Sequence, residues 1–231
     1  MFCFKKFCLI DENTPMKIGM DSVLLGAWAN SIENGLTIDL GSGCGLLTFM
    51  MAQRFPDCEY IGIEIHEGAF LDSLTNLQTF PQNQNIHFYK YDFLTFDFQN
   101  EVDTIISNPP YFSETIHPKN YGRFLARTQG EGFLESMVRK VADILSPHGI
   151  ISLVYDTKSL NSLTELCLKH GLFLQRSCFI KHFENHNPKR VLLQFGKISK
   201  PLVTEYITLR NSEKEFGDEY KKMTRDFYLN F

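Results

Sequence analysis

The feature that most constrains the fold is an apolar segment that runs directly into three closely spaced glycines. Residues 36–40 read Leu-Thr-Ile-Asp-Leu, the glycines are Gly41, Gly43 and Gly45, and residues 46–54 have helical character. A strand, a glycine turn and a helix form the first half of a nucleotide-binding βα unit. Glycine permits positive φ and a close approach of the backbone to a ligand. The segment therefore predicts a parallel α/β sheet with a ligand site at this turn.

The spacing of the glycines bears on which ligand is bound. A dinucleotide fingerprint has Gly or Ala at the position where Leu46 stands. This departure argues against NAD or FAD and favours a cofactor without a pyrophosphate. An NAD oxidoreductase is further disfavoured because the sequence lacks a set of residues for hydride transfer.

Two acidic residues come at the ends of later predicted strands. Glu64 lies 19 residues beyond Gly45, where a carboxylate usually holds a ribose diol. Asp92 comes shortly after the strand predicted at 86–89 and stands next to Phe93. Asp92 is a candidate acceptor for an adenine amino group, and a solvated surface position is the alternative.

A fourth predicted strand ends in a polar corner, where residues 105–112 read Ile-Ile-Ser-Asn-Pro-Pro-Tyr-Phe. The prolines fix φ and remove two backbone donors, and the first forces Asn108 into an extended conformation. The corner therefore presents acceptors, the side-chain oxygen of Asn108 and the carbonyl of Pro109, beside the ring of Tyr111. Open α/β sheets bind ligands at the carboxyl ends of their strands. Acceptors next to an aromatic ring suit a planar group that carries NH2, such as adenine or a carboxamide.

The segment from 113 to 128 mixes basic with aromatic residues. Its basic and aromatic members include Lys119, Tyr121, Arg123, Phe124 and Arg127. This mixture suits a nucleic-acid backbone and an unstacked base at the mouth of a site. A solvated lid is the alternative interpretation.

The remaining patterns alternate between helix and strand. Helices are expected at 66–79, 131–145 and 158–170, and strands at 150–155, 172–179, 191–195 and 206–210. Asp21 or Ser22 is expected to cap a short helix that includes Trp28. Together the elements predict a doubly wound, mostly parallel, seven-stranded sheet with an antiparallel terminal strand.

The length and composition favour one domain and exclude several classes of protein. The chain has 231 residues and 43% hydrophobic residues, which is enough for a full core. We expect an arm and helix at 1–30, a core at 31–198 and an extension at 199–231. No apolar run is long enough to span a membrane and no signal peptide is evident, which predicts a cytosolic protein. Six scattered cysteines indicate neither a zinc site nor a disulfide framework, so we expect reduced thiols and no metal. We also expect the protein to be a monomer.

The charge is distributed unevenly along the chain. Residues 1–155 carry 10 Lys and Arg against 18 Asp and Glu, whereas residues 156–231 carry 13 against 9. The net charge of -4 does not suit a general nucleic-acid coat. The asymmetry nevertheless permits a basic face on an acidic protein, although scattered solvated charges would give the same count.

Taken together, the motifs resemble a known family. Residues 39–45, Glu64, Asp92 and 108–111 look like the first four motifs of class I S-adenosylmethionine-dependent methyltransferases, and the Asn-Pro-Pro-Tyr form is typical of those acting on exocyclic or amide nitrogens. More specific blocks resemble the bacterial tRNA1(Val) adenine-37 N6-methyltransferases over nearly the whole chain. These blocks are 4–7, 16–19 with Asp21, 24–29, 107–112, 190–193 and 227–229.

The resemblance implies methyl transfer from S-adenosylmethionine to the exocyclic N6 of an adenine in tRNA, at position 37 beside the anticodon of tRNA1(Val). It implies that the catalytic residues are Asn108, Pro109 and Tyr111. It implies that the cofactor-binding residues are Asp39, Gly41, Gly43, Gly45, Glu64, Asp92, Phe93 and Asn108, with Glu64 on the ribose, Asp92 and Phe93 at the adenine, and Asp39 at the methionine ammonium directly or through water. It also implies substrate contacts by Tyr111, Phe112, Lys119, Arg123 and Arg127.

Two other functions remain open. A protein glutamine N5-methyltransferase uses the same Asn-Pro-Pro-Tyr logic on a carboxamide, although such enzymes usually carry an N-terminal helical bundle that is not seen here. A catalytically idle RNA-binding factor on a methyltransferase scaffold is the second alternative, and the complete set of motifs argues against it. Other adenine N6 substrates, in rRNA or DNA, also remain open.

Overall fold

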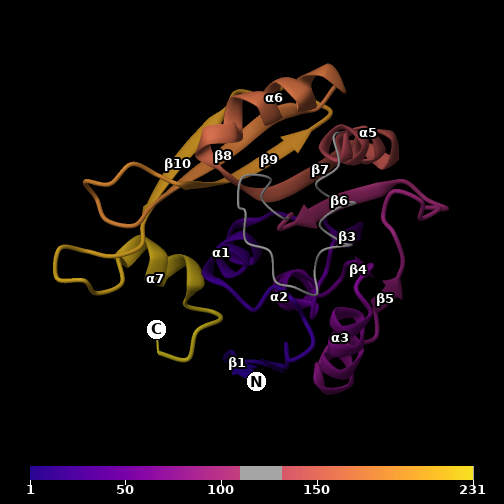
Figure 1. Cartoon of the computed structure of the whole chain (residues 1–231), viewed down its shortest axis with the longest axis horizontal. Coiled ribbons are helices and arrows are strands. Elements are labelled where there is room, and N and C mark those ends of the chain that lie inside the picture. The colour runs from indigo at the N-terminus through magenta and orange to yellow at the C-terminus, as the bar shows by residue number, and fades with distance from the viewer. Residues whose placement is uncertain (110–131, 231) are drawn as a thin grey trace.

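Eight segments form the strands of one large sheet in the computed structural model, which describes residues 1–109 and 132–230 (Figure 1). Successive side chains of a strand point to opposite faces, so apolar strands of this kind are buried on both sides. The strands are β3 (Leu36–Leu40), β4 (Glu59–Glu64), β5 (Ile86–Lys90), β6 (Val102–Ser107), β7 (Leu145–Asp156), β8 (Phe173–Lys181), β9 (Arg190–Gly196) and β10 (Val203–Thr208).

The spatial order of the strands is β10-β8-β9-β7-β6-β3-β4-β5. Neighbouring strands are parallel except where β9 is involved, since β9 is antiparallel to both β7 and β8. The parallel strands therefore all end at one edge of the sheet. The predicted fold class, a mostly parallel doubly wound sheet with an antiparallel strand, is confirmed. The predicted number of seven strands is wrong, because the C-terminal extension adds β10 beside β8.

Helices cover both faces of this sheet (Figure 1). Neighbouring residues of one strand pack into different cores, as Ile106 does on one face and Ile105 on the other. The expected helices are present with ends shifted by a few residues. The first face carries α1 (Met20–Trp28), α2 (Leu46–Arg54), α3 (Glu67–Thr79) and α7 (Asp218–Thr224), and the second carries α5 (Phe133–Ile144) and α6 (Leu160–Lys169).

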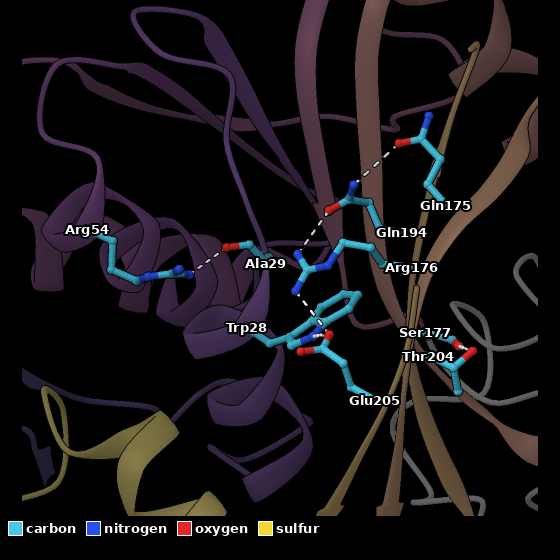
Figure 2. A network of polar contacts seen from close by, with 9 residues as sticks. All are labelled: Trp28, Ala29, Arg54, Gln175, Arg176, Ser177, Gln194, Thr204 and Glu205. Atoms are coloured by element: carbon cyan, nitrogen blue, oxygen red, sulfur yellow. Dashed lines mark hydrogen bonds and ion pairs between the residues drawn. The ribbon is translucent and has the colours of Figure 1, made fainter. Parts of the chain in front are cut away.

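A polar network holds β10 against the rest of the fold, and Figure 2 shows its contacts gathered around Trp28. Glu205 of β10 accepts a hydrogen bond from Trp28 Nε1 at 2.8 Å and pairs with Arg176 of β8 at 3.1 Å. The Arg176 guanidinium also lies 4.3 Å from the centre of the Trp28 ring, within the range of a cation–π contact. Arg176 Nη1 donates to Gln194 of β9 at 3.4 Å. Trp28 of helix α1 therefore contacts β10 and β8 directly, and Arg176 extends the network to β9.

The first residues fold back as a small hairpin, β1 (Phe2–Cys3) and β2 (Cys8–Leu9), with Phe4 buried in the core below it. Cys3 and Cys8 are directly opposite each other in this hairpin, and they form a disulfide. The expectation of reduced thiols is wrong for this pair, because the turn brings together two cysteines whose spacing gives no recognised motif. The other four cysteines are free and buried.

Helix α1 begins differently from the prediction. Gly19 occupies the N-cap position and no side chain caps the helix. Asp21 and Ser22, the predicted caps, lie in the first turn, and both make long-range contacts instead. Asp21 pairs with Arg190 at 3.2 Å, and Ser22 contacts Asn108. The prediction of a side-chain cap is wrong because tertiary partners occupy both side chains.

Candidate active site

A cavity of about 360 Å³ opens where β3, β4 and β6 end. Its walls are the glycine loop, the end of β4, the turn after β5, the end of β6 and the segment before α1. Seven predicted site residues line it: Gly41, Gly43, Glu64, Asp92, Phe93, Asn108 and Pro109. Asp39 and Gly45 are not part of its lining. The other predicted site residues, Tyr111, Phe112, Lys119, Arg123 and Arg127, lie outside the described residues.

The glycine loop has the backbone geometry that its sequence predicts. Gly41, Gly43 and Gly45 all have positive φ, at 72°, 57° and 89°. A Cβ on Gly41 would meet nothing within 4 Å, because this residue borders open space. A Cβ on Gly45 would lie 2.6 Å from the Phe49 ring and 2.8 Å from the Phe88 ring. Gly41 therefore leaves room at the cavity, whereas Gly45 allows close packing beneath it.

Gly45→Ala should lower the free energy of unfolding by about 2 to 5 kcal/mol, because it adds a steric clash to an unfavourable φ. Urea denaturation checks the value. Gly41→Ala is the matched control, since its φ is also positive but its Cβ would be in open space, and it should cost only about 1 to 2 kcal/mol. Equal losses for the two variants would show that packing against Phe49 and Phe88 does not require glycine.

Glu64 is a buried carboxylate that organises the loop. Its Oε2 accepts a hydrogen bond from the Gly43 N–H at 2.9 Å, and its Oε1 accepts one from the His66 N–H at 2.7 Å. Burial raises the pKa of the Glu64 carboxyl above its usual range, while these two N–H groups oppose the shift. Each carboxylate oxygen can accept a further hydrogen bond, so Glu64 can hold the loop and a ligand hydroxyl together.

Asp39 lies behind the loop and is 1% exposed. Its Oδ2 accepts from the backbone N–H of Thr48 at 3.0 Å and from its hydroxyl at 2.7 Å, which fixes the first turn of α2. Burial raises the pKa of the Asp39 carboxyl to about 7; the Thr48 hydrogen bonds oppose this shift and the nearby Glu64 adds to it. Asp39 therefore supports the loop from beneath.

The turn after β5 forms another wall of the cavity. Asp92 Oδ1 accepts a hydrogen bond from the Leu94 N–H at 3.0 Å, which holds the turn in shape. Asp92 is half-buried and Phe93 is buried, and both line the cavity. A carboxylate beside an aromatic ring can receive the amino group of a planar base.

Asn108 follows β6 directly, and its side-chain amide contacts residues in α1 and in the segment before it. Asn108 Nδ2 donates to Ser22 Oγ at 2.8 Å and lies 3.7 Å from the sulfur of Met16. A thioether sulfur can accept but cannot donate a hydrogen bond, so the NH2 group of the amide belongs on this side. The amide oxygen therefore points the other way. Met16 and Ser22 line the same cavity.

Met16 and Ser22 are site residues that the sequence did not single out. The block from 16 to 21 stood out only as a family signature, and Ser22 was expected to cap a helix. The two residues come from a segment that lies 86 or more positions before Asn108. Local patterns give no signal for contacts at that separation.

Helix α3 holds the segment before α1 in place as a wall of the cavity. The buried Asp72 accepts hydrogen bonds from the backbone and side chain of Asn13, both at 2.9 Å, and from the Thr14 hydroxyl at 2.8 Å. Asn76, one turn along α3, donates to the carbonyls of Ile10 and Cys44, each at 2.9 Å. The N-terminal segment and the glycine loop are thus fixed by the same helix.

Acceptor atoms at the glycine loop show what kind of ligand the cavity suits. Among the buried polar atoms of the described residues that lack a hydrogen-bond partner, Ser42 Oγ belongs to the cavity lining and Asp39 Oδ1 lies behind it. Both belong to the glycine loop or its base, and the loop also leaves open space at Gly41. An elongated ligand with an amino group and ribose hydroxyls matches the acceptors that line the cavity, which are Ser42 Oγ and the carboxylates of Glu64 and Asp92. The residues therefore fit S-adenosylmethionine.

Residues 1–109 and 132–230 contain no cluster of three or more His, Cys, Asp or Glu side chains able to hold a metal ion. Among the helices of these same ranges, none combines the length and the apolar character that crossing a membrane requires.

The model of the methyltransferase small domain family matches residues 19–166, so this α/β fold with a cavity at the ends of its strands belongs to a methyltransferase. More narrowly, the chain belongs to the bacterial tRNA1(Val) (adenine(37)-N6)-methyltransferase family. The protein of that name from Histophilus somni (strain 2336) is 33% identical over 234 residues, which cover 100% of this chain and 98% of the relative. The Bacteroides thetaiotaomicron protein is 31% identical, with 99% and 97% covered. The resemblance in the motifs is thereby confirmed.

Solved structures share the fold at lower sequence identity. A predicted O-methyltransferase from Agrobacterium tumefaciens superposes with a TM-score of 0.67 at 17% identity, covering 90% of this chain and 96% of its own. A methyltransferase from Pyrococcus furiosus gives 0.56 at 20% identity, with 80% and 90% covered. At this identity the similarity concerns the fold alone.

Proposed function

We propose that the protein transfers a methyl group from S-adenosylmethionine to the exocyclic N6 of adenine 37 in tRNA1(Val), in the cytoplasm. The observation that carries the proposal is the Asn108 amide, held at the cavity wall with its NH2 group towards Ser22 and Met16. Full-length similarity to relatives that bear this name supports the choice of substrate.

For this reaction, the main task of the protein is to position the two reactants. The lone pair of adenine N6 is delocalised into the ring, so N6 is a poor nucleophile. If Asn108 Oδ1 and the Pro109 carbonyl accept its two hydrogens, and Tyr111 stacks on the base, the lone pair is directed at the methyl group. Holding the reacting atoms about 3 to 3.5 Å apart then supplies most of the rate gain. No strong base is required, because the N–H proton becomes acidic once nitrogen is alkylated.

The cofactor supplies an electrophilic methyl group on a sulfonium. We propose that Gly41 and Gly43 let it approach the backbone, while Gly45 lets the loop pack on Phe49 and Phe88 beneath it. We also propose that Glu64 accepts hydrogen bonds from its ribose. Asp92 and Phe93 contact its adenine. Asp39 stabilises its ammonium group, either through the loop or through water. The target base leaves its stack at a cost of a few kcal/mol, which stacking on Tyr111 and Phe112 partly offsets. Lys119, Arg123 and Arg127 are proposed to contact the RNA backbone.

Nucleoside mass spectrometry tests the proposal. The protein is incubated with S-adenosylmethionine and tRNA that lacks N6-methyladenosine, with free protein and DNA as parallel acceptors. N6-methyladenosine next to the anticodon of one valine tRNA is the expected result. Methylation of a protein glutamine would show that the substrate is the alternative carboxamide. Methylation of no acceptor would favour a catalytically idle scaffold.

Ser22→Ala should lower kcat for tRNA methylation about five- to twentyfold and leave the Kd for S-adenosylmethionine unchanged. The variant removes the acceptor that orients the Asn108 amide, and one neutral hydrogen bond accounts for an effect of about this size. Steady-state kinetics and calorimetry together separate the two quantities.

Ser22→Thr is the matched control, because it keeps the hydroxyl and should retain most of the rate. A cycle with Asn108→Ala then identifies the route of the effect. If Ser22 acts through Asn108, Ser22→Ala should change little in the Asn108→Ala background. An equal loss in both backgrounds would contradict the positioning role.

A further inference from the structure

The edge of the sheet that holds the cavity continues beyond it, past the ends of β7, β8 and β10 and the start of β9. The segment 181–190, which we call the rim loop, joins β8 to β9 at this edge. Segment 209–217 lies beside it on the left of Figure 1. The Leu209 N–H donates to the Lys181 carbonyl at 2.8 Å, and the Arg210 N–H donates to the His182 carbonyl at 3.1 Å. The two segments thus form one continuous surface.

The rim loop is connected to Asn108 by two contacts. Its last residue, Arg190, pairs with Asp21 at 3.2 Å. The next residue after Asp21 is Ser22, whose hydroxyl lies 2.8 Å from Asn108 Nδ2. Lys189 also accepts a backbone hydrogen bond from Thr157 at the end of β7. The rim loop and Asn108 therefore lie along the same edge of the sheet, linked through Arg190, Asp21 and Ser22.

Three rings gather on the rim loop outside both hydrophobic cores. Phe183 lies 4.6 Å from His182 and 5.1 Å from His186 between ring centres, edge-on to both. The two histidine rings are within 24° of parallel and 6.2 Å apart. Both histidines are exposed and Phe183 is half-buried. Phe183 thus supports two exposed, similarly oriented ring faces.

This part of the edge carries an excess of positive charge. Three loops of the edge, 157–159, 181–190 and 209–217, carry more positive than negative side chains. The positive ones are Lys158, Lys181, Lys189, Arg190, Arg210 and Lys214, and the negative ones are Glu184, Glu213 and Glu215. Rings beside cations match single-stranded nucleic acid, in which every base has a face to stack and every phosphate a charge.

We propose that the rim loop binds the single-stranded RNA next to the target adenine, with bases stacked on His182 and His186 and phosphate held by Lys189. This proposal rests on the proposed tRNA substrate. Six of the 13 Lys and Arg of residues 156–231 lie on these three loops, along the proposed path of the RNA and outside the lining of the cavity.

The double variant His182→Ala/His186→Ala tests the stacking. The full-length protein is titrated against a fluorescein-labelled anticodon stem-loop of tRNA1(Val), followed by fluorescence anisotropy. We expect its Kd for RNA to rise about tenfold, while its Kd for S-adenosylmethionine stays at the wild-type value. The matched control is His87→Ala/His148→Ala, which removes two exposed histidines located elsewhere and should leave both values unchanged.

Lys189→Ala tests the phosphate contact. The slope of log K against log salt concentration should become shallower by about 0.7, the value for one contact to a single strand. Lys169→Ala is the control, because Lys169 forms a surface ion pair with Glu135 at the far end of α6. Its salt slope should match that of the wild type.

Two results would overturn the rim-loop proposal while leaving the tRNA activity intact. One is wild-type RNA affinity and salt slope in both rim variants. The other is equal loss of affinity for polyglutamate and for RNA in the histidine variant, which would indicate a general anion site without stacking. A wild-type protein that binds no tRNA would overturn the proposed function itself and the rim loop with it.

Discussion

Asn108→Ala is expected to lower methyl transfer to tRNA at least a hundredfold, while the Kd for S-adenosylmethionine stays within a few-fold of wild type. The substitution removes the proposed acceptor for the N6 hydrogens and keeps the backbone of the proline corner. The cavity around the cofactor would be little changed, because the glycine loop, Glu64 and the turn at Asp92 come from other strands.

The expected pattern follows from where Asn108 acts. An acceptor that meets the base only when N6 is aimed at the methyl group lowers the barrier without strengthening cofactor binding. The loss of this acceptor therefore lowers kcat. Single electrostatic partners of this kind are worth about two to three powers of ten in rate.

Single-turnover transfer of labelled methyl groups measures the rate, and calorimetry measures cofactor binding. Asn30→Ala, at an exposed position outside the cavity, controls for loss of an asparagine as such. A tenfold loss of rate corresponds to an increase of about 1.4 kcal/mol in the activation barrier. A variant that kept more than about a tenth of the wild-type rate would refute the assignment of Asn108.

The parts of the fold that the sequence predicts well are those that depend on local patterns. The glycine loop, the strand that ends in Glu64 and the strand that delivers Asn108 are all present where periodicity and glycine spacing place them. Each is recognisable because a buried strand is apolar on both faces. The first and the last of the three are also followed by glycine or proline at a sharp turn. These local features are enough to predict that the principal cavity residues lie at one edge of the sheet.

The parts that the sequence misses depend on distant contacts. Ser22 resembles a helix cap until the fold places it beside Asn108. Glu205 resembles a surface carboxylate on an added strand, yet Trp28 and Arg176 hold it against α1 (Figure 2). Such pairs are separated by 86 and 177 positions, and no local periodicity records them.

Glu64→Ala is expected to raise the Kd for S-adenosylmethionine about thirty- to hundredfold and to change kcat at saturating cofactor only a few-fold. The variant removes the proposed ribose acceptor. It also leaves the N–H groups of Gly43 and His66 without their carboxylate, so the loop loses part of its shape. Isothermal calorimetry gives the Kd directly.

Glu67→Ala is the matched control, three residues along the chain. Glu67 is exposed and pairs only at the surface with Lys90, at 2.9 Å, so its loss should leave the Kd unchanged. An unchanged Kd in Glu64→Ala as well would refute the ribose role.

The two effects of Glu64, on the ribose and on the loop, separate in a cycle with 2′-deoxy-S-adenosylmethionine. If the carboxylate accepts from the ribose, the missing hydroxyl should weaken binding to the wild type about tenfold and weaken binding to Glu64→Ala far less. If Glu64 only holds the loop, the missing hydroxyl should cost both proteins the same. The hydrogen bonds from Gly43 and His66 use one lone pair of each oxygen, so each oxygen can accept one further hydrogen bond, as a diol requires. We therefore expect the missing hydroxyl to weaken binding more in the wild type than in Glu64→Ala. The part of the effect of Glu64→Ala that comes from the altered loop should be the same with either form of the cofactor.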